Sequence, residues 1–253
     1  MNSDYIAVFD SGVGGLSVLR ELLKIMPNER YLYFGDSANA PYGTRSTEEV
    51  RQLTLAAAEK LVKRGIKALV VACNTATSAA IEQLRAQYPN LIVVGIEPAL
   101  KLAADTFPGG NIGIMATQVT LREEKFHALC HRVAEDCRLF PIPAPGLVEL
   151  VESGKADSPE MDAFLENLLA PYRGKLQALV LGCTHYPFAE KAIAKVLPGT
   201  ALLQGGAGTA QQTRRRLEQQ GLLHTGPGEI LLENSLNSEE ILEISHKLLE
   251  VSL

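Results

Sequence analysis

Two cysteines stand at equivalent places in two similar stretches of the sequence. Residues 67–75 read KALVVACNT and residues 177–185 read QALVLGCTH, so that Cys73 and Cys183 each follow a short run rich in Val and Leu. Such a run, followed by helix-compatible sequence, is typical of a buried parallel strand in an α/β sheet. Each thiol is therefore predicted at the carboxyl end of a strand, the edge at which open α/β sheets bind ligands.

A thiol in this position could act as an acid or a base. The amino end of a following helix favours the thiolate and lowers the thiol pKa, and a free thiol near pKa ~8.5 needs only a modest shift to work near neutral pH. A buried cysteine at a strand end is also common and inert. Packing alone gives no reason for a thiol to recur in both stretches with a Thr nearby. The repeat therefore favours a catalytic role for the two thiols. His185 follows Cys183 closely, and Asp10 ends the strand expected beside the first thiol strand, so both are candidates for tuning the thiols.

The elements that would position these residues form two similar halves. Strand-like and helix-like segments alternate, and the pattern restarts near Asn111–Ala116. We predict an α/β fold of two pseudo-symmetric domains with mainly parallel sheets flanked by helices, and an active site in the cleft between them. Residues 1–96 and 208–253 are assigned to the first domain, which carries Cys73, and residues 97–207 to the second, which carries Cys183.

A linker and two helices are predicted in the last fifty residues. The run Gly205–Gly208 is predicted to be a linker, and a helix is predicted over Thr209–Gln220. A last helix is predicted over Ser238–Val251, and the sequence leaves open which domain it packs on.

A glycine-rich turn, Gly12–Gly15, follows the first predicted strand. It superficially resembles a dinucleotide-binding turn, but Ser17 stands where the G-x-G-x-x-G pattern needs Gly or Ala. The turn could instead be a tight connection that needs small residues. It could also form a pocket in which Asp10, Ser11 and backbone amides hold a small charged ligand, and we favour this interpretation.

Composition narrows the range of functions. The formal net charge is −5 and the pI is about 5.6, which argues against an extended phosphate-binding surface and hence a nucleic-acid partner. No apolar run has transmembrane length, and the first residues do not resemble a signal peptide. We therefore expect a cytoplasmic protein without a membrane partner, and its four cysteines to be reduced thiols.

A possible metal site was considered on one predicted helix. His127, Cys130 and His131 fall on one helical face, and Cys137 lies nearly two turns beyond Cys130. Zinc sites of this kind usually use two loop-borne pairs of ligands. A partly buried amphipathic helix explains the segment better, and no metal is expected.

Several ordered motifs together resemble one family. They are DSGVGGLSVL at Asp10, GDSANAPYG at Gly35, ACNTAT at Ala72, GIEPA at Gly95 and LGCTHYP at Leu181. Over nearly its whole length the sequence resembles the glutamate racemases, which belong to the cofactor-independent aspartate/glutamate racemase superfamily. The sequence departs from the family at residues 203–206, which read LQGG where relatives commonly carry an acidic, serine-containing segment.

The resemblance implies that the protein interconverts L- and D-glutamate and supplies D-glutamate for peptidoglycan, and hence for the cell wall and cell shape. It implies that Cys73 and Cys183 are the acid-base thiols on either side of the α-carbon, with assistance from Asp10, His185 and Glu152. No cofactor is expected, and a homodimer is expected. The implied substrate-binding residues are Asp10, Ser11, Tyr42, Gly43, Asn74, Thr75, Thr184 and His185.

Two other functions stay open at this point. An aspartate racemase would share the paired thiols, although the aspartate-specific relatives resemble this chain mainly through those thiols and not through the longer motifs. A thiol redox or metal-binding module would instead pair the two cysteines or use them as ligands. The wide separation of Cys73 from Cys183 and the lack of a C-x-x-C arrangement disfavour this second alternative.

Overall fold

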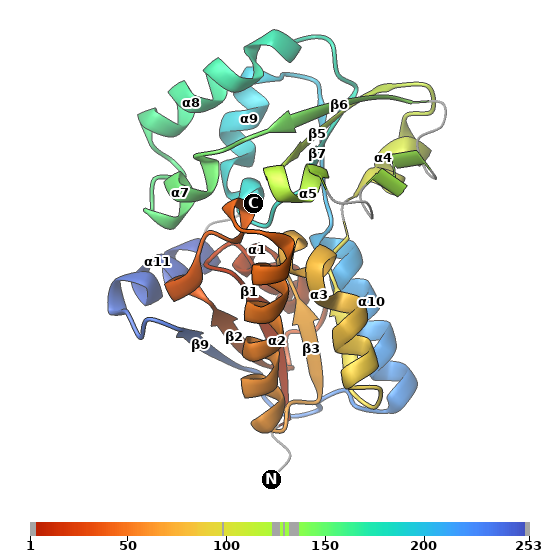
Figure 1. Ribbon diagram of the computed structural model, residues 1–253, viewed down its shortest axis with the longest axis vertical. Helices are drawn as coiled ribbons and strands as arrows, with labels where there is room; N and C mark the ends of the chain where they lie inside the picture. Colours follow the sequence, from red (N-terminus) through yellow and green to blue (C-terminus); the bar gives the residue numbers. More distant parts are fainter. Residues whose placement is uncertain (1–3, 98, 123–126, 129, 132–136, 251–253) are drawn as a thin grey trace.

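The computed structural model describes the whole chain apart from residues 1–3, 98, 123–126, 129, 132–136 and 251–253. The described strands form two separate sheets, one of five strands and one of four. Figure 1 shows the sheets in two lobes, one above the other, each with helices packed around it. The first and last parts of the chain share the lower lobe, and the middle part forms the upper one.

The first sheet has the strand order β4-β3-β1-β2-β9, and all of its paired strands are parallel. Because β1 pairs with β3, the strand that ends at Asp10 lies beside the strand that precedes Cys73, as predicted. The strands of this sheet are β1 (Tyr5–Asp10), β2 (Arg30–Gly35), β3 (Ala68–Val71), β4 (Ile92–Gly95) and β9 (Glu229–Asn234).

The second sheet repeats this arrangement. Its order is β6-β5-β7-β8, again with parallel pairs, so that β5, β6, β7 and β8 take the places that β1, β2, β3 and β4 take in the first sheet. The predicted α/β fold with two similar, mainly parallel halves is therefore confirmed. The strands are β5 (Asn111–Ala116), β6 (Arg138–Pro143), β7 (Ala178–Leu181) and β8 (Ala201–Gln204).

Helices cover both sheets. Helix α1 packs against α10 and α11, α2 packs against α3, and α8 packs against α9. The described helices are α1 (Leu16–Ile25), α2 (Thr47–Lys63), α3 (Asn74–Gln87), α4 (Leu100–Thr106), α5 (Gln118–Arg122), α7 (Leu147–Glu152), α8 (Pro159–Leu169), α9 (Glu190–Val196), α10 (Gly206–Gln220) and α11 (Glu239–Glu250). Short 3-10 helices are η1 (Ser37–Asn39), η2 (Tyr42–Thr44), η3 (Ala170–Tyr172) and η4 (Tyr186–Ala189).

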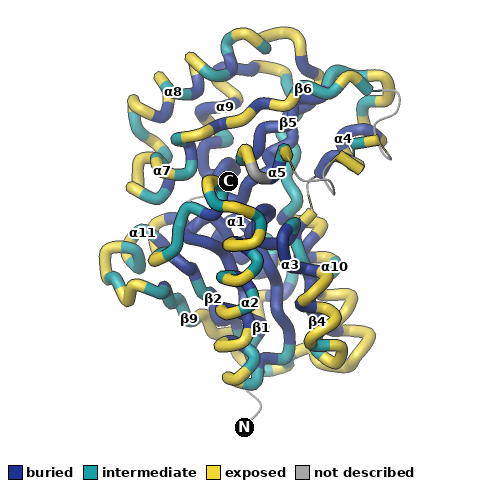
Figure 2. Tube along the Cα trace, in the orientation of Figure 1, coloured by how far each residue is buried: buried dark blue, intermediate teal, exposed yellow. Residues whose placement is uncertain are grey.

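Local sequence explains where several helices begin. Ser46 and Glu49 form a reciprocal capping box at the start of α2, and the Ser158 hydroxyl caps α8 just before Pro159. Each cap satisfies backbone amides that the first helical turn leaves without partners. The strands that carry the thiols, β3 and β7, are buried at all four positions, which accounts for their uninterrupted apolar sequence. Figure 2 shows buried backbone in the middle of both lobes and exposed backbone on the outer helices.

Parts of the carboxyl-terminal third differ from the sequence-based prediction. The predicted linker is wrong at Gly206–Gly208, because these residues form the first turn of α10. That helix begins two residues before the predicted boundary at residue 208, and it packs on α1 and β4. Strand β9 was not predicted, and α11 packs on α1 and β9. The division into domains by residue number stays a prediction.

Candidate active site

Cys73 lies between β3 and α3, where it is the N-cap residue of the helix. Its sulfur accepts a hydrogen bond from the Ala76 amide at 3.5 Å and lies 3.7 Å from the Ser11 hydroxyl. The side chain is almost completely buried. The predicted place of this thiol, at the junction of a strand and a helix, is correct.

The predicted fall in the pKa of this thiol is wrong, because other influences outweigh that of the helix. Burial and the nearby charge of Asp10 raise the pKa of Cys73 to about 12, although the Ala76 amide acts in the opposite sense. Burial disfavours the charged thiolate more strongly than one amide favours it. The thiol is therefore the resting form of Cys73 at neutral pH.

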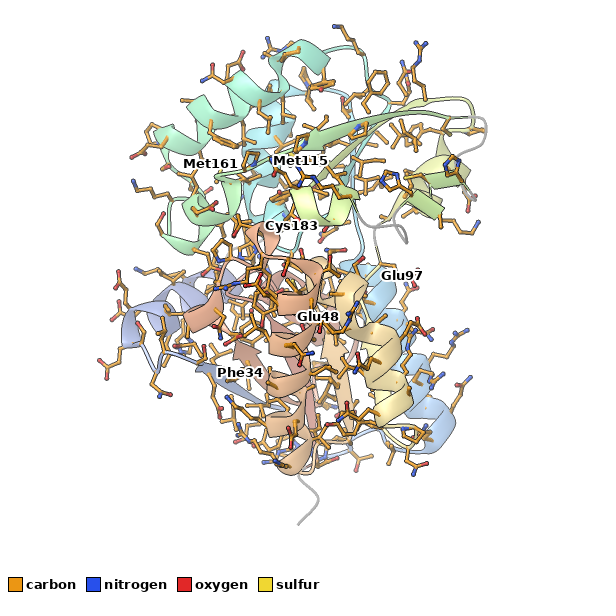
Figure 3. The ribbon with its side chains drawn as sticks, viewed as in Figure 1. Phe34, Glu48, Glu97, Met115, Met161 and Cys183 are labelled. Atoms are coloured by element: carbon orange, nitrogen blue, oxygen red, sulfur yellow. The ribbon has the colours of Figure 1, made fainter. Side chains whose placement is uncertain are left out.

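Cys183 follows β7 and has different surroundings. A 3-10 helix, η4, comes next in the chain, and its N-cap residue is His185 and not the cysteine. The sulfur of Cys183 lies 3.6 Å from Nδ1 of His185. In Figure 3, Cys183 is at the level where the two lobes meet. The imidazole of His185 is therefore in contact with the Cys183 sulfur.

His185, which is buried, pairs with Glu152, which is partly buried. Nε2 of His185 lies 2.6 Å from Oε1 of Glu152, and the histidine is 2% exposed. Burial opposes the imidazolium, but hydrogen bonds with Cys183 and Glu152 outweigh it and raise the pKa of His185 well above its ordinary value. Burial also opposes the Glu152 carboxylate, yet the His185 contacts lower its pKa. We therefore assign the pair as imidazolium and carboxylate.

Asp10 links the two halves of the molecule. It is fully buried, and one carboxylate oxygen accepts the Gly12 amide while the other accepts the Thr184 hydroxyl, both at 3.0 Å. Burial raises the pKa of Asp10, although His185 and these hydrogen bonds act against the shift. The Thr184 hydroxyl, implied in substrate binding, is engaged with Asp10.

The glycine-rich turn is a contact surface for the other half of the protein. A Cβ atom at Gly12 would lie 1.8 Å from Glu152 Oε1, and one at Gly14 would lie 2.3 Å from His185 Nδ1. The Val13 amide donates to Glu152 Oε1 at 2.9 Å. The turn thus binds a carboxylate of the protein itself. The favoured interpretation, in which its backbone amides bind a ligand, is therefore wrong for the Val13 amide.

The remaining predicted substrate-binding residues gather at the same edge. The Tyr42 hydroxyl donates to Asp36 at 2.7 Å, so its proton is already engaged within the protein. Gly43 lies against Thr117, with which an added Cβ would collide at 2.9 Å. Both polar atoms of the Asn74 side chain are buried without a hydrogen-bond partner among the described residues. A buried amide of this kind is a candidate for ligand binding.

Two threonines near the site were missed by sequence reasoning. Thr117 and Thr120 lie within hydrogen-bond distance of the Thr75 hydroxyl, at 3.3 and 3.5 Å. Thr117 directly follows β5, as Ser11 directly follows β1. In each sheet this residue and the cysteine both lie two positions after a pair of residues in register, Phe9 with Val71 and Met115 with Leu181. Aligning the two halves from their thiols back to these strands would have identified Thr117 as the equivalent of Ser11.

A small cavity borders this cluster. It has a volume of about 90 Å³ and lies between the Pro41–Thr44 segment of the lower lobe and Thr117, Gly146 and Tyr186 of the upper one. A wider groove of about 720 Å³ is lined by residues of β4, α4 and α10. Neither thiol lines either cavity, but the small one is lined by Gly43 and by Thr117, which contacts Thr75. We therefore place the candidate site at the two strand ends and the small cavity beside them.

The sequence matches the Asp/Glu/hydantoin racemase family over residues 8–213. The chain belongs to this family. It is therefore an isomerase of the racemase class. Glutamate racemase of Clostridium acetobutylicum is 49% identical over 249 residues, which are 97% of this chain and 97% of that protein.

Solved structures of this racemase family share the fold. Glutamate racemase of Francisella tularensis in complex with D-glutamate is 26% identical, with a TM-score of 0.84 over 99% of this chain and 96% of that one. Glutamate racemase of Escherichia coli in complex with L-glutamate and an activator is 30% identical, with a TM-score of 0.87 over 96% of this chain and 94% of that one.

The described part of this racemase chain has neither a metal-binding cluster nor a helix that could cross a membrane. No three His, Cys, Asp or Glu side chains among those residues are grouped to hold a metal ion. His127, Cys130, His131 and Cys137 are described, but several residues between them are not. The described helices include none that is long and apolar enough to cross a membrane.

Proposed function

We propose that the chain interconverts L- and D-glutamate by proton transfer at the α-carbon, with Cys73 and Cys183 as the two acid-base groups and without a cofactor. The observation that carries the proposal is the pair of thiols at the carboxyl ends of β3 and β7, the equivalent strands of the two sheets. The glutamate racemases that this chain resembles, one holding D-glutamate and one L-glutamate, support glutamate as the substrate.

Two thiols are needed because a single base would return the proton to the face from which it came. In the proposed reaction, one cysteine as thiolate takes the α-proton, which breaks a C–H bond and forms an S–H bond. The other cysteine as thiol gives its proton to the opposite face of the carbanion and becomes a thiolate. The reverse reaction restores the first state, so the enzyme's proton count is unchanged.

The carbanion is the difficult intermediate, because an amino-acid α-proton is far less acidic than a thiol. Oriented hydrogen-bond donors at the substrate carboxylate, in a site that excludes water, would stabilise the developing charge. The unpartnered Asn74 amide is one such donor, and the hydroxyls of Thr75, Thr117 and Thr120 are others. Asn74 and Thr75 directly follow Cys73 in the chain, and Thr117 and Thr120 lie within hydrogen-bond distance of Thr75.

The two thiols would enter the reaction from different surroundings. Cys73 rests as the thiol, because burial and the Asp10 charge oppose its ionisation. Cys183 lies beside His185, which is paired with Glu152 and can exchange a proton with the sulfur. We propose that Asp10, His185 and Glu152 assist the thiols in this way. In a bacterial cell the D-glutamate would serve peptidoglycan synthesis. The cytoplasmic location and the homodimer stay predictions.

The test is incubation of the purified, reduced protein with L-glutamate in deuterated water without added cofactor. Optical rotation is expected to decay while deuterium enters the α-carbon. Activity with aspartate and none with glutamate would show that the protein is a racemase but that glutamate is not its substrate. Silence with both, together with a Cys73–Cys183 disulfide or bound zinc by intact mass and metal assay, would favour the thiol module.

The same assay tests the two thiols. C73S and C183S are each expected to lose racemisation by a factor of roughly 10²–10⁴, the usual contribution of a positioned acid or base. Circular dichroism should show an intact fold, because serine is close to cysteine in size. C130S, which changes a thiol outside the site, is the control and should keep wild-type activity. Full activity in either C73S or C183S would contradict the two-base mechanism.

A further inference from the structure

The two thiols are held in place by different means. Cys73 is the N-cap residue of α3, and the Ala76 amide of that helix donates to its sulfur. A helix of its own half of the molecule therefore fixes it. Cys183 precedes η4, whose N-cap residue is His185. The turn that carries Cys183 has backbone hydrogen bonds within its own half, from Gly182 to Met115 and from Tyr186 to Cys183, and it is also bonded to the other half.

Thr184, the residue between Cys183 and His185, makes two such bonds. Its hydroxyl donates to Asp10 at 3.0 Å, and its carbonyl oxygen accepts the Ser17 hydroxyl at 2.8 Å. Thr184 is 3% exposed and Ser17 is 1% exposed. Backbone and side chain of Thr184 are thus both attached to the lower lobe, from which the Cys183 strand itself is separate.

Ser17 supplies the backbone attachment from the first turn of α1. A hydroxyl has one proton to donate, and the Ser17 oxygen lies 2.8 Å from the Thr184 carbonyl and 2.9 Å from the Gly14 carbonyl. The Gly14 carbonyl also accepts the Ser17 amide at 3.0 Å, so we assign the hydroxyl proton to the Thr184 carbonyl. This bond links the start of α1 to the turn after β7. A buried carbonyl whose hydrogen-bond donor is removed costs stability, and it also loses a contact that holds its position.

We infer that Ser17 is a positioning residue for Cys183, whose hydroxyl sets the place of that thiol through the Thr184 carbonyl. The inference rests on the proposed two-thiol racemisation of glutamate. Loss of the Ser17 hydroxyl loosens the turn from Cys183 to His185. Cys73 keeps its own helix cap and its contact with Ser11, so the change acts on one thiol only.

This asymmetry has a kinetic signature. Because two enantiomers have equal free energy, any variant must lower kcat/KM by the same factor in both directions. Proton abstraction, however, is carried out by a different thiol in each direction. If Cys183 is misplaced, abstraction becomes more rate-limiting only for the enantiomer from which Cys183 takes the proton. The primary deuterium isotope effect then rises for that enantiomer and not for its mirror image.

The experiment compares S17A with the wild-type protein. Initial rates are measured with each enantiomer of glutamate, carrying hydrogen or deuterium at the α-carbon. S17A is expected to lower kcat/KM roughly three- to tenfold in both directions, as the loss of one hydrogen bond does. Its isotope effect is expected to rise for one enantiomer only. Residual α-proton exchange by C73S, which retains Cys183, identifies that enantiomer independently.

S245A is the matched control. Ser245 is also a buried helical serine, but its hydroxyl bonds the Ile241 carbonyl of its own helix, α11. S245A should keep the wild-type rate and isotope effects. S17C, which keeps the volume and weakens the donor, should show the same one-sided change and serves if S17A does not fold.

Two outcomes would overturn the role of Ser17. One is an unchanged kcat/KM in S17A, and the other is an isotope effect that changes equally for both enantiomers. A wild-type protein that does not racemise glutamate would instead overturn the proposed function, and the role of Ser17 with it. The wild-type assay therefore separates failure of the function from failure of the positioning residue.

Discussion

Asp10 influences Cys73 through its charge. The carboxylate is buried, accepts bonds from Gly12 and Thr184, and raises the pKa of the Cys73 thiol together with burial itself. The sequence predicted that Asp10 would lie near this thiol, because the strands before them are neighbours. It could not predict the direction of the pKa shift, since the depth of burial depends on the whole of the surrounding packing.

D10N is expected to lower the pKa of Cys73 from about 12, because it removes a negative charge that opposes the thiolate. Thiolate absorbance, taken as the difference from C73S in the same background, should rise at lower pH in D10N than in the wild type. D105N, at an exposed partner of Lys101, is the control and should leave the midpoint in place. An unchanged midpoint in D10N would show that burial alone sets the pKa.

The same shift has a consequence for stability. The pKa of Cys73 is raised in the folded protein, from 9.0 to about 12, so the folded state keeps a proton that the unfolded chain releases. The contribution of this thiol to stability is complete below pH 9 and is lost as the pH rises toward 12. D10N should weaken this loss, which urea unfolding at several pH values would measure.

At the scale of elements, the turn before α1 is a place where the two lobes approach closely. Neither Gly12 nor Gly14 has a positive φ, so the backbone conformation alone would accept other residues. What requires glycine is the approach of Glu152 and His185, which come from α7 and from the turn after β7. Sequence reasoning recognised the turn but not its partner, because the partner lies in the other half of the chain.

G14A is expected to reduce kcat by about 10²-fold, because a Cβ atom 2.3 Å from His185 Nδ1 must displace the ring beside Cys183. G208A is the control. Gly208 lies in the first turn of α10, and a Cβ there meets nothing within 4 Å. G208A should keep wild-type activity and gain up to about 1 kcal/mol of stability, as Ala does over Gly in a helix. Wild-type kcat in G14A would show that the lobes can separate there without loss.

The elements themselves were predictable to different degrees. Strands β3 and β7 are apolar at every position because both faces are covered, and that pattern is plain in the sequence. Strand β9 is an edge strand that is exposed at its first two positions, so its pattern is weak and it was missed. The glycines at the start of α10 resemble a linker locally, and only packing on α1 and β4 makes them helical.

At the scale of the whole molecule, the candidate site and a stabilising cluster of ion pairs lie at opposite ends of the strands of the first sheet. The candidate site lies at the carboxyl ends of the strands. At their amino ends, Lys67 lies just before β3 and forms ion pairs with Glu29 at 2.7 Å and Asp4 at 2.9 Å. It also donates to the Leu222 carbonyl, in the segment that leads to β9. This cluster joins the starts of three strands, β1, β2 and β3, and the segment after α10. No sequence motif predicted it.

K67M is therefore expected to lower stability strongly and leave the chemistry intact. Glu29 is 2% exposed, and a buried charge that loses its partner costs about 3–5 kcal/mol, a large part of the stability of an ordinary domain. Thermal and urea unfolding would measure the loss, and kcat well below the melting temperature should equal that of the wild type. K63M removes an exposed pair with Glu59 and should leave the melting temperature unchanged. A K67M protein that is stable but inactive would show that the two edges are coupled through the strands, contrary to the separation argued from their positions.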